Sequence, residues 1–326
     1  MIFMPRYSIG APFARSGLSV SSMLGETLAA LIVLLIVPAA HYGIRPIIMA
    51  GAAVLTCAVC EIICGFFQYG KLYVSDVSFA VTGLVIAMLM PLNAPVWLPC
   101  AASMAAELAA KIPFGQYGRQ PFNPAAAGAA FAALCWPAET FTYFDPSKPF
   151  VLPAFGSCTY TAAMSPAAVL KNGLKPDVQP LDMLWGTATG ALGTTAVLVI
   201  AACGLFLFLR RSANFEITLS FLAACAVIAA FFPRIMCSPL TSVKYEMLSG
   251  SLLFCSVFMV TDPATSPGTV VGRCFYGAFA GCMLMVMRHF GAFEQGAFFA
   301  VLFANALSPL IDKVSLRTVR VWRQVV

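Results

Sequence analysis

The stretch CTYTAAMSPAAVLKNG at 158–173 holds the residues best suited to chemistry in this chain. It carries several hydroxyl groups, a proline and Lys171 between two blocks of strongly apolar sequence. A chain that is mostly apolar helix has little chemistry of its own, so it must borrow a cofactor and hold it where the backbone leaves the lipid. A simpler interpretation is a loop that leads into a short helix, with Ser165 as N-cap and Pro166 at the first helical position. The two interpretations are compatible.

The composition of the 326 residues indicates a membrane protein. Hydrophobic residues make up 60% and charged residues 10% of the chain, against roughly 25% charged in soluble domains. The net charge of +6 reflects Lys and Arg at the ends of spans, so we expect the lipid bilayer, and no nucleic acid, as a partner. We expect no cleavable signal peptide, because the basic start lacks an apolar run that ends in a small-residue cleavage site.

Hydropathy predicts an all-α polytopic membrane protein with about ten transmembrane helices. The third, fifth and eighth are short and rich in Gly, Pro or small residues, and such spans often break partway and line a cavity. The predicted spans lie near 22–40, 46–66, 77–91, 94–111, 122–137, 183–209, 215–232, 247–260, 272–288 and 293–311.

The distribution of Lys and Arg predicts the orientation. With a cytosolic N-terminus, twelve of these residues fall on the inner side and seven on the outer side. Because cytoplasmic segments carry the excess of Lys and Arg, we expect both termini inside the cell and 138–182 outside it.

Two pairs of segments suggest that the chain is doubled. SDVSFAVTGLVIAMLMP at 75–91 has a counterpart in YEMLSGSLLFCSVFMVTDPATSP at 245–267, and FGQYGRQPFNPAAAGAAFAAL at 114–134 has one in FGAFEQGAFFAVLFANALSPL at 290–310. Span three matches span eight, an offset of five spans. Because this number is odd, the second copy runs through the membrane in the opposite direction. We therefore expect a first five-helix repeat at 1–137, an extracytoplasmic segment at 138–182 and a second repeat at 183–326.

Several strings, in this order among ten spans, carry a family resemblance. They include SIGAPFARSGLSVSSMLGETLAALI, VTGLVIAMLMPLNAPVWLP, AAKIPFGQYGRQPFNPAAAG, LDMLWGTATGALGTTA, FMVTDPATSPGTVVGR and NALSPLIDK. On these residues the chain resembles the D subunit of the Rnf complex, an ion-translocating ferredoxin:NAD oxidoreductase. It is also similar to the B subunit of the sodium-pumping NADH:quinone reductase.

The resemblance implies a subunit that carries flavin mononucleotide (FMN), esterified to a Thr in a Ser-Gly-Ala-Thr-like motif outside the membrane. Here Thr161-Ala162-Ala163-Met164 covers that motif, and Met164 at the acceptor position cannot form the ester. We therefore expect Ser165 to be the acceptor, with Thr161 second and Lys171 helping to neutralise the phosphate. A non-covalent or absent flavin remains an alternative.

Glycines and hydroxyls follow in GTATGALGTT at 186–195. We expect this segment to open span six, with Gly186, Gly190 and Gly193 on roughly one helical face. The simpler role of these glycines is close helix packing. The resemblance implies instead that Gly186, Thr187 and Gly190 let the backbone approach a flavin ring.

Two further candidates are Asn123 and Asp262, which each precede a proline beside a short span. Their oxygens, with carbonyls freed by proline, could line an ion or cofactor cavity, although capping alone would also explain them. The resemblance implies that these elements surround a second flavin, such as riboflavin.

Three carboxylates, Glu26, Glu61 and Glu107, lie inside apolar runs, where an ionised group usually pairs or faces a polar cavity. They are candidates for proton or sodium transfer, or for docking partner subunits. Cys57, Cys60 and Cys64 share one helical side, but we expect packing thiols and no metal site, since no fourth ligand is near in sequence.

The leading hypothesis is an electron-transfer subunit of an Rnf-type translocase in the cytoplasmic membrane, which passes electrons through flavin between partner subunits while Na⁺ or H⁺ moves. We expect no complete active site and no nicotinamide site in this chain alone. The alternatives are a solute channel or transporter on the same plan and a structural subunit without flavin.

Overall fold

The computed structural model describes residues 19–69, 76–115, 118–151, 153, 156 and 158–325. The expectations for the first eighteen residues, and the charges counted at Arg6, Arg15 and Lys71, lie outside this part of the chain. In the described part the fold is built from α-helices and one small hairpin. The helices of the first half are α1 (Val20–Tyr42), α2 (Arg45–Tyr69), α3 (Ser78–Leu89), α4 (Trp97–Ala105), α5 (Pro124–Cys135) and α6 (Pro137–Phe141). A π-helical segment (Ala106–Lys111) and a 3₁₀ turn (Ile112–Phe114) continue α4.

The second half begins in the segment that links it to the first. The hairpin and two short helices come first, and two long helices come last. These elements are β1 (Tyr143–Phe144), β2 (Ala162–Ala163), α7 (Pro166–Lys171), α8 (Pro180–Trp185), α9 (Val197–Leu209), α10 (Phe215–Phe231), α11 (Pro239–Leu248), α12 (Leu252–Phe258), α13 (Val270–Phe290) and α14 (Ala297–Val325).

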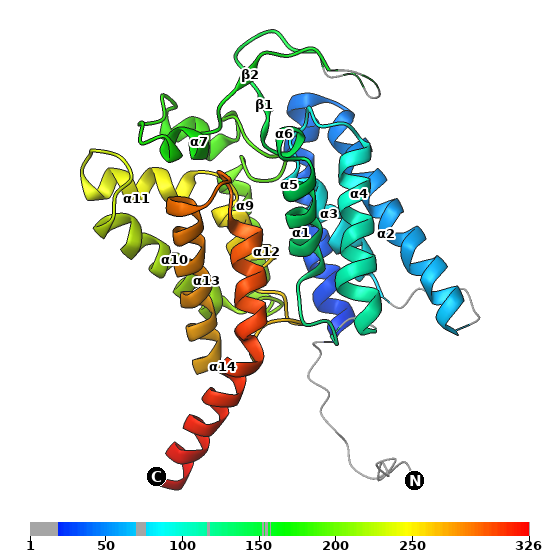
Figure 1. Ribbon diagram of the computed structural model, residues 1–326, viewed down its shortest axis with the longest axis vertical. Helices are drawn as coiled ribbons and strands as arrows, with labels where there is room; N and C mark the ends of the chain where they lie inside the picture. The colour runs from blue at the N-terminus through cyan, green and yellow to red at the C-terminus, as the bar shows by residue number, and fades with distance from the viewer. Residues whose placement is uncertain are drawn as a thin grey trace.

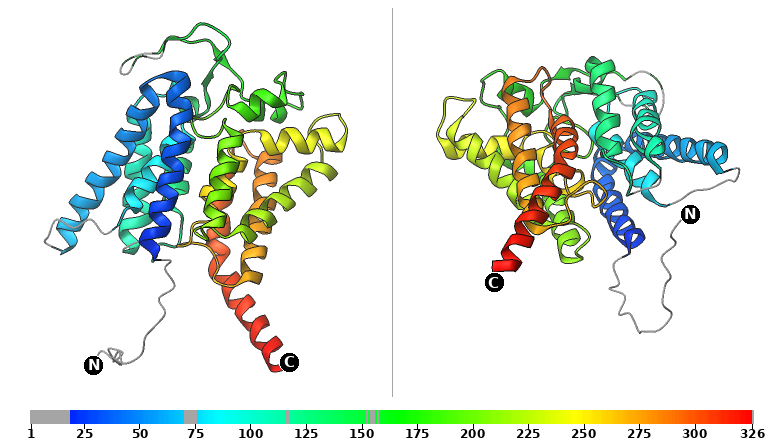
Figure 2. Two further views of the ribbon diagram at one scale, coloured as in Figure 1. Left: turned by 180° about the vertical axis from the view of Figure 1, so that it is seen from behind. Right: turned by 60° about the horizontal axis from the view of Figure 1, so that its bottom comes forward.

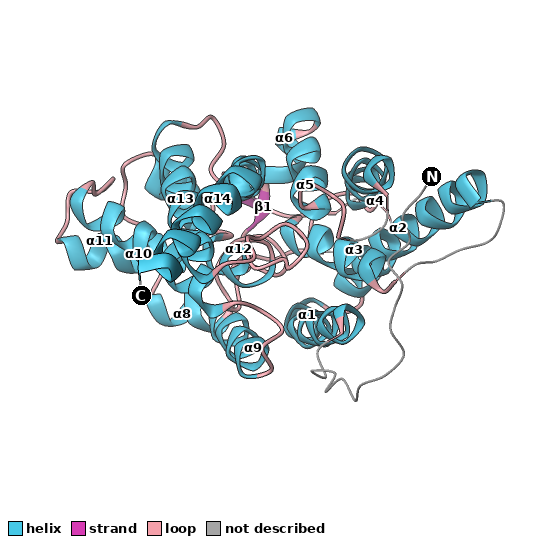
Figure 3. Ribbon diagram, turned by 90° about the horizontal axis from the view of Figure 1, so that it is seen from below, coloured by secondary structure: helices cyan, strands magenta, loops and turns pink. Residues whose placement is uncertain are grey.

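The helices form two groups side by side, α1–α6 and α9–α14 (Figure 1). Within the groups, α2 packs against α3 and α4, and α10 and α14 pack against α13. Between the groups, α1 packs against α9 and α5 against α14. The buried side chains of both groups belong to one continuous hydrophobic core, which includes Leu34, Ile86, Phe221 and Phe254. Viewed from the end where α14 terminates, α12 lies near the middle of the bundle (Figure 3).

The segment between the two groups covers one end of the bundle. β1 and β2 pair antiparallel with Tyr143 opposite Ala163, and α7 and α8 follow them. This cap lies at the end opposite to the start of α1 and the end of α14 (Figure 2). The cap therefore lies at the same end of the bundle as the last turn of α1.

Within the described part of the chain, four helices are long and apolar enough to cross a bilayer: Val20–Tyr42, Arg45–Phe67, Val270–Phe290 and Ala297–Arg317. Four others are apolar but shorter: Ser78–Leu89, Pro124–Cys135, Val197–Leu209 and Phe215–Phe231. A helix of 13 residues such as α9 is only about 20 Å long, whereas the hydrocarbon core is about 30 Å thick. The chain is therefore a multi-pass helical membrane protein, and the number of ten crossings stays a prediction.

The short predicted spans are short helices in the structure. α3 and α5 have 12 residues each, and α12 has 7. α12 is separated from α11 by Ser249, Gly250 and Ser251, and Gly250 has a φ of 63°, a left-handed conformation that glycine adopts without strain. The eighth span therefore begins five residues later than expected.

The expectation for the sixth span was wrong. Residues 186–196 are not helical, because Gly186 (φ 91°) ends α8 in a left-handed conformation. The loop then runs along the end of α3, where the N–H groups of Leu192 and Gly193 donate to the carbonyls of Met90 and Met88 at 3.0 and 2.8 Å. Gly186, Gly190 and Gly193 consequently do not form a helical face.

Candidate cofactor-attachment site

Ser165 has the local structure that the sequence predicts. Pro166 is the first residue of α7, and the Ser165 Oγ accepts a hydrogen bond from the N–H of Ala168 at 3.1 Å. The Ser165 side chain is 1% exposed, and its hydroxyl donates to Oε2 of Glu294 at 2.9 Å. The hydroxyl is thus a buried helix cap with a carboxylate partner from the loop before α14.

Glu294 belongs to a buried polar network that sequence reasoning missed. Gln295 Nε2 donates to the Tyr143 hydroxyl at 2.9 Å and lies 3.5 Å from Glu294 Oε1. Burial disfavours the charged form and raises the pKa of Glu294, and burial also raises the pKa of Tyr143. No signal for this network stands in the sequence, because the doubled segments place the FEQ at 293–295 opposite the YGR at 117–119, which holds no carboxylate.

The other predicted residues of the 158–173 stretch lie nearer the surface. Thr161 is exposed, and its carbonyl accepts from the N–H of Asp145 at 3.0 Å. Met164 is 65% exposed, which leaves it outside the core. The Lys171 ammonium donates to the carbonyl of Ala292, in the same loop that supplies Glu294.

The loop 186–196 brings Gly190 next to Ser165. A cavity of about 10 Å³ is lined by Ser165, Gly190, Thr194, Gly250 and Gln295, among others. This volume is close to the minimum for one water molecule. Gly190 itself allows a close approach, since a Cβ there would lie 2.9 Å from Thr195 Cγ2.

A larger, open cavity of about 650 Å³ lies on the other side of the same loop. Thr187, Ala188 and Thr189 line it, and Ala188 and Thr189 also line the Ser165 cavity. Asp145, Asp177 and Asp182 give this cavity a negative lining. Its volume lies within the roughly 300–1,000 Å³ of small-molecule sites, but its carboxylates disfavour a phosphate. Gly186 is outside both linings and acts as the C-cap of α8.

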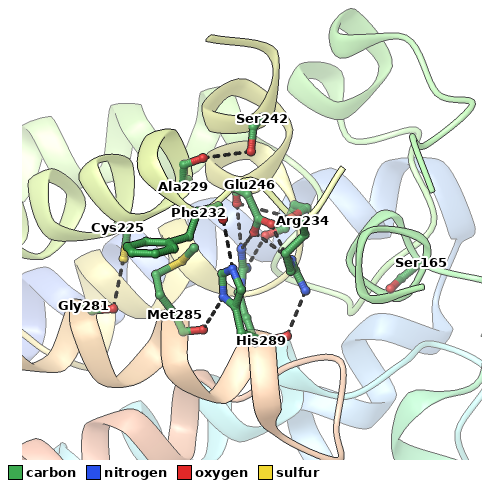
Figure 4. A network of polar contacts seen from close by, with 12 residues as sticks. Ser165, Cys225, Ala229, Phe232, Arg234, Ser242, Glu246, Gly281, Met285 and His289 are labelled. Carbon is green, nitrogen blue, oxygen red and sulfur yellow. Dashed lines mark hydrogen bonds and ion pairs between the residues drawn. The ribbon is translucent and has the colours of Figure 1, made fainter. Parts of the chain in front are cut away.

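Arg234 and Glu246 belong to a buried ion network (Figure 4). Arg234 binds both oxygens of Glu246, at 2.5 and 2.8 Å, and Arg288 binds Glu246 Oε2 at 2.9 Å. Arg288 is 1% exposed, and its Nε has no hydrogen-bond partner among the described residues. A Cβ on Gly250 would lie 3.3 Å from Arg288 Nη2 and 3.3 Å from Ala167 of α7. Two guanidinium groups on one carboxylate leave a surplus positive charge beside α7. In the sequence, these two arginines were only counted among the seven basic residues of the outer side.

Asn123 and Asp262 come together at the opposite end of the bundle. Asn123 caps α5 by accepting from the N–H of Ala126 at 3.1 Å. Its Nδ2 lies 3.2 Å from the carbonyl of Met259 and 3.3 Å from Asp262 Oδ2. Both residues line a cavity of about 50 Å³ that also contacts Met23 and Leu24, in the first turns of α1.

Most of the predicted residues lie in two regions, one at each end of the bundle. At the capped end, Ser165 and Gly190 line the small cavity, and Thr187 lines the open cavity together with His41 and Tyr42 from the last turn of α1. The second site pairs Asn123 with Asp262 near the start of α1.

The three carboxylates in apolar runs have different partners. Glu26 pairs with Arg210 at 2.6 Å and accepts a hydrogen bond from Ser212, so it joins the start of α1 to the end of α9. Glu61 and Glu107 both pair with Lys111.

The fold and the sites define a helical membrane protein with a polar site at each end of one bundle. The profile of the NQR2, RnfD, RnfE family matches residues 8–320, and the chain belongs to this family. The D subunit of the ion-translocating oxidoreductase complex of Halorhodospira halophila is 31% identical over 260 residues, 73% of each chain. The D subunit of the Na⁺-translocating ferredoxin:NAD⁺ oxidoreductase complex of Acetobacterium woodii is 27% identical over 93% of this chain and 91% of its own. The D subunit of the proton-translocating ferredoxin:NAD⁺ oxidoreductase complex of Clostridium ljungdahlii is 26% identical over 93% of this chain and 92% of its own.

Proposed function

We propose that this chain is the D subunit of an Rnf-type ion-translocating oxidoreductase complex. The observation that carries the proposal is the family match over residues 8–320, together with relatives of similar length that bear this name. The chain works with other subunits of the complex, which supply the nicotinamide and ferredoxin sites. Because one relative is named for Na⁺ and another for protons, the family name alone does not choose the ion.

The proposed architecture is two inverted five-helix repeats in the cytoplasmic membrane. The contacts of α1 with α9 and of α5 with α14 support it, because each joins the first or the last helix of one repeat to its counterpart in the other. The start of α1 and the end of α14 lie at one end of the bundle, as both termini on the cytoplasmic side require (Figure 1). The cap with α7 then faces the outside.

The proposed cofactor is FMN, held covalently by a hydroxyl of the 158–173 segment. A bound flavin supplies the one- and two-electron chemistry that these helices lack. Ser165 is the first acceptor, because Lys171 and the surplus charge of the Arg234–Glu246–Arg288 network lie near it and suit a phosphate. The residues around Ser165 match a phosphate in charge, but the adjacent cavity of about 10 Å³ has no room for a flavin ring. Attachment would also require the Ser165–Glu294 hydrogen bond to open. Thr161, whose side chain is exposed, is the second acceptor.

The cavity beside Asn123 and Asp262 is too small for a flavin in this arrangement. Its volume of about 50 Å³ is several times smaller than the roughly 300 Å³ at which small-molecule sites begin. A second flavin such as riboflavin would need the two repeats to separate there. In the present arrangement the cavity suits ordered water.

A flavin-free structural subunit is the second candidate, because Ser165 is buried and already has a partner. The test is to purify the full chain with its complex and look for flavin fluorescence at its band in a denaturing gel. Fluorescence that Ser165→Ala or Thr161→Ala removes supports the electron carrier. A dark band and a purified complex without any flavin bound to this chain would favour the structural subunit.

A further inference from the structure

Glu61, Glu107 and Lys111 form a buried cluster in which two carboxylates share one ammonium. Lys111 Nζ lies 3.2 Å from Glu107 Oε1 and 3.5 Å from Glu61 Oε2. Glu107 is 0% exposed and Lys111 is 3% exposed. Glu107 therefore holds only part of the charge of its buried partner. An ionised carboxylate inside an apolar bundle is unfavourable unless its charge is fully compensated.

Glu107 also has a free acceptor for a further cation. Its Oε2 is buried and has no hydrogen-bond partner among the residues that the structure describes. The hydroxyl of Ser103, one turn earlier and 0% exposed, is also without one. The thiol of Cys57 on α2 lies close to both side chains. Both side chains therefore adjoin the Cys57 thiol, between α2 and the continuation of α4.

The backbone at this point is also unusual. Residues Ala106–Lys111 form a π-helix, in which the N–H of Ile112 donates to the carbonyl of Glu107 five residues earlier. Such wide turns occur mostly as single-turn interruptions, frequently at functional sites. Leu108 and Met104 on the same stretch are 46% and 45% exposed, so the cluster lies directly beneath the outer surface of the bundle.

The surroundings of Glu107 favour a proton over a metal ion. Among the described residues, no three His, Cys, Asp or Glu side chains are arranged to hold a metal ion. Two unpartnered oxygens are too few for a dehydrated Na⁺, whereas a proton needs only one acceptor. The groups that face Glu107 are Glu61, Cys57 and Cys60 on α2 and Lys111 on its own helix. The neighbouring helix α5 carries Cys135 as its sole ionisable side chain.

We propose that Glu107 is a proton-exchanging carboxyl of the translocase. Its carboxylate takes up one proton at Oε2, which removes its negative charge from the apolar interior, and releases that proton when the Lys111 ammonium pairs with it alone. Glu61, whose side chain is 11% exposed, is the most exposed member of the cluster. Glu26 has no such role, because Arg210 and Ser212 already satisfy it. This inference rests on the proposed function in one respect: proton exchange at Glu107 serves ion transport only if the chain belongs to a translocase.

Dicyclohexylcarbodiimide tests the inference, because this apolar reagent modifies protonated carboxyl groups within membranes. Membranes that contain the full complex would be treated between pH 6 and 9, and the peptides of this chain analysed by mass spectrometry. We expect the reagent mass on Glu107, at least tenfold more than on Glu26, and a loss of labelling towards alkaline pH. Lys111→Met should carry the labelling of Glu107 to higher pH, because the ammonium that favours its charged form is gone.

The native chain provides the primary result, so the inference does not depend on a variant that folds poorly. No labelling of Glu107 at any pH, while another carboxyl in the same sample reacts, would overturn it. Protection of Glu107 by Na⁺ but not by choline at equal ionic strength would also overturn it, in favour of a sodium site. Neither result depends on flavin, which is measured on a different peptide, so this inference and the flavin proposal can fail separately.

Discussion

Ser165 and Glu294, 129 positions apart in the sequence, share a hydrogen bond of 2.9 Å in which the hydroxyl donates. The bond ties α7 in the cap to the loop before α14 in the second helical group. It also places the proposed flavin acceptor against a carboxyl whose pKa is raised by burial. A substitution at either residue therefore removes a hydrogen-bond partner of the other.

The first prediction concerns the pH dependence of stability. Because the folded-state pKa of Glu294 lies above its ordinary value of about 4.3, the folded protein binds the proton more tightly than the unfolded one. The stabilisation is present in full below the ordinary value and is lost as pH rises through the folded-state value. Glu294→Gln should flatten this decline in the midpoint of thermal unfolding of the detergent-solubilised protein. The control Asp177→Asn, in the cap, should leave the decline unchanged, and an equal slope in both variants would contradict the account.

The second prediction concerns the buried ion network of Arg234, Glu246 and Arg288. Glu246→Leu leaves two buried guanidinium groups without their carboxylate, which costs about 3–5 kcal/mol. Arg210→Ala removes an arginine whose side chain is 62% exposed from its pair with Glu26 and should cost about 0–1 kcal/mol. Thermal unfolding of the two variants in the same detergent compares them. Similar losses would mean that the buried network contributes no more than a surface pair.

The third prediction concerns the loop that replaces the expected start of span six. A Cβ on Gly193 would lie 2.5 Å from Met88 Cβ, so Gly193→Ala must push the loop away from α3. We expect a loss of about 1–3 kcal/mol, as for overpacking in a core. Gly268→Ala is the matched control, because nothing lies within 4 Å of its Cβ position. Equal stabilities of the two variants would show that the loop does not pack as described.

The fourth prediction concerns the contact between Asn123 of α5 and Asp262 of the second helical group. Asn123→Asp keeps the helix cap but replaces an amide donor, 3.3 Å from Asp262 Oδ2, by a second carboxylate. We expect a loss of about 1–3 kcal/mol from the lost amide donor and the like charges. Adding Asp262→Asn should recover much of this loss, because it restores one amide and one carboxylate. Additive losses in the double variant would mean that the two side chains do not interact.

Much of the helical layout follows from the sequence. Length and hydropathy predicted α1, α2, α10 and α13 within about three residues at each end, and the cap at Ser165 followed from its position before Pro166. These features depend on local chemistry, which one segment displays by itself.

The features that sequence reasoning missed depend on distant partners. Gly186 was assigned to a helix because its spacing to Gly190 fits one, but the carbonyls at the end of α3 offer the loop N–H groups an alternative. Glu294 and Arg288 were overlooked as site residues, because their partners lie 129 and 42 residues away. No local pattern reports such pairings.

The measurement that tests the central claim most directly is the mass of the peptide spanning 158–171, taken from the full chain purified within its complex. The account predicts the added mass of a flavin phosphate on Ser165, with Ser165→Ala losing that mass while the fold is kept. The same peptide at its unmodified mass, from a complex that is otherwise complete and active in electron transfer, would contradict it.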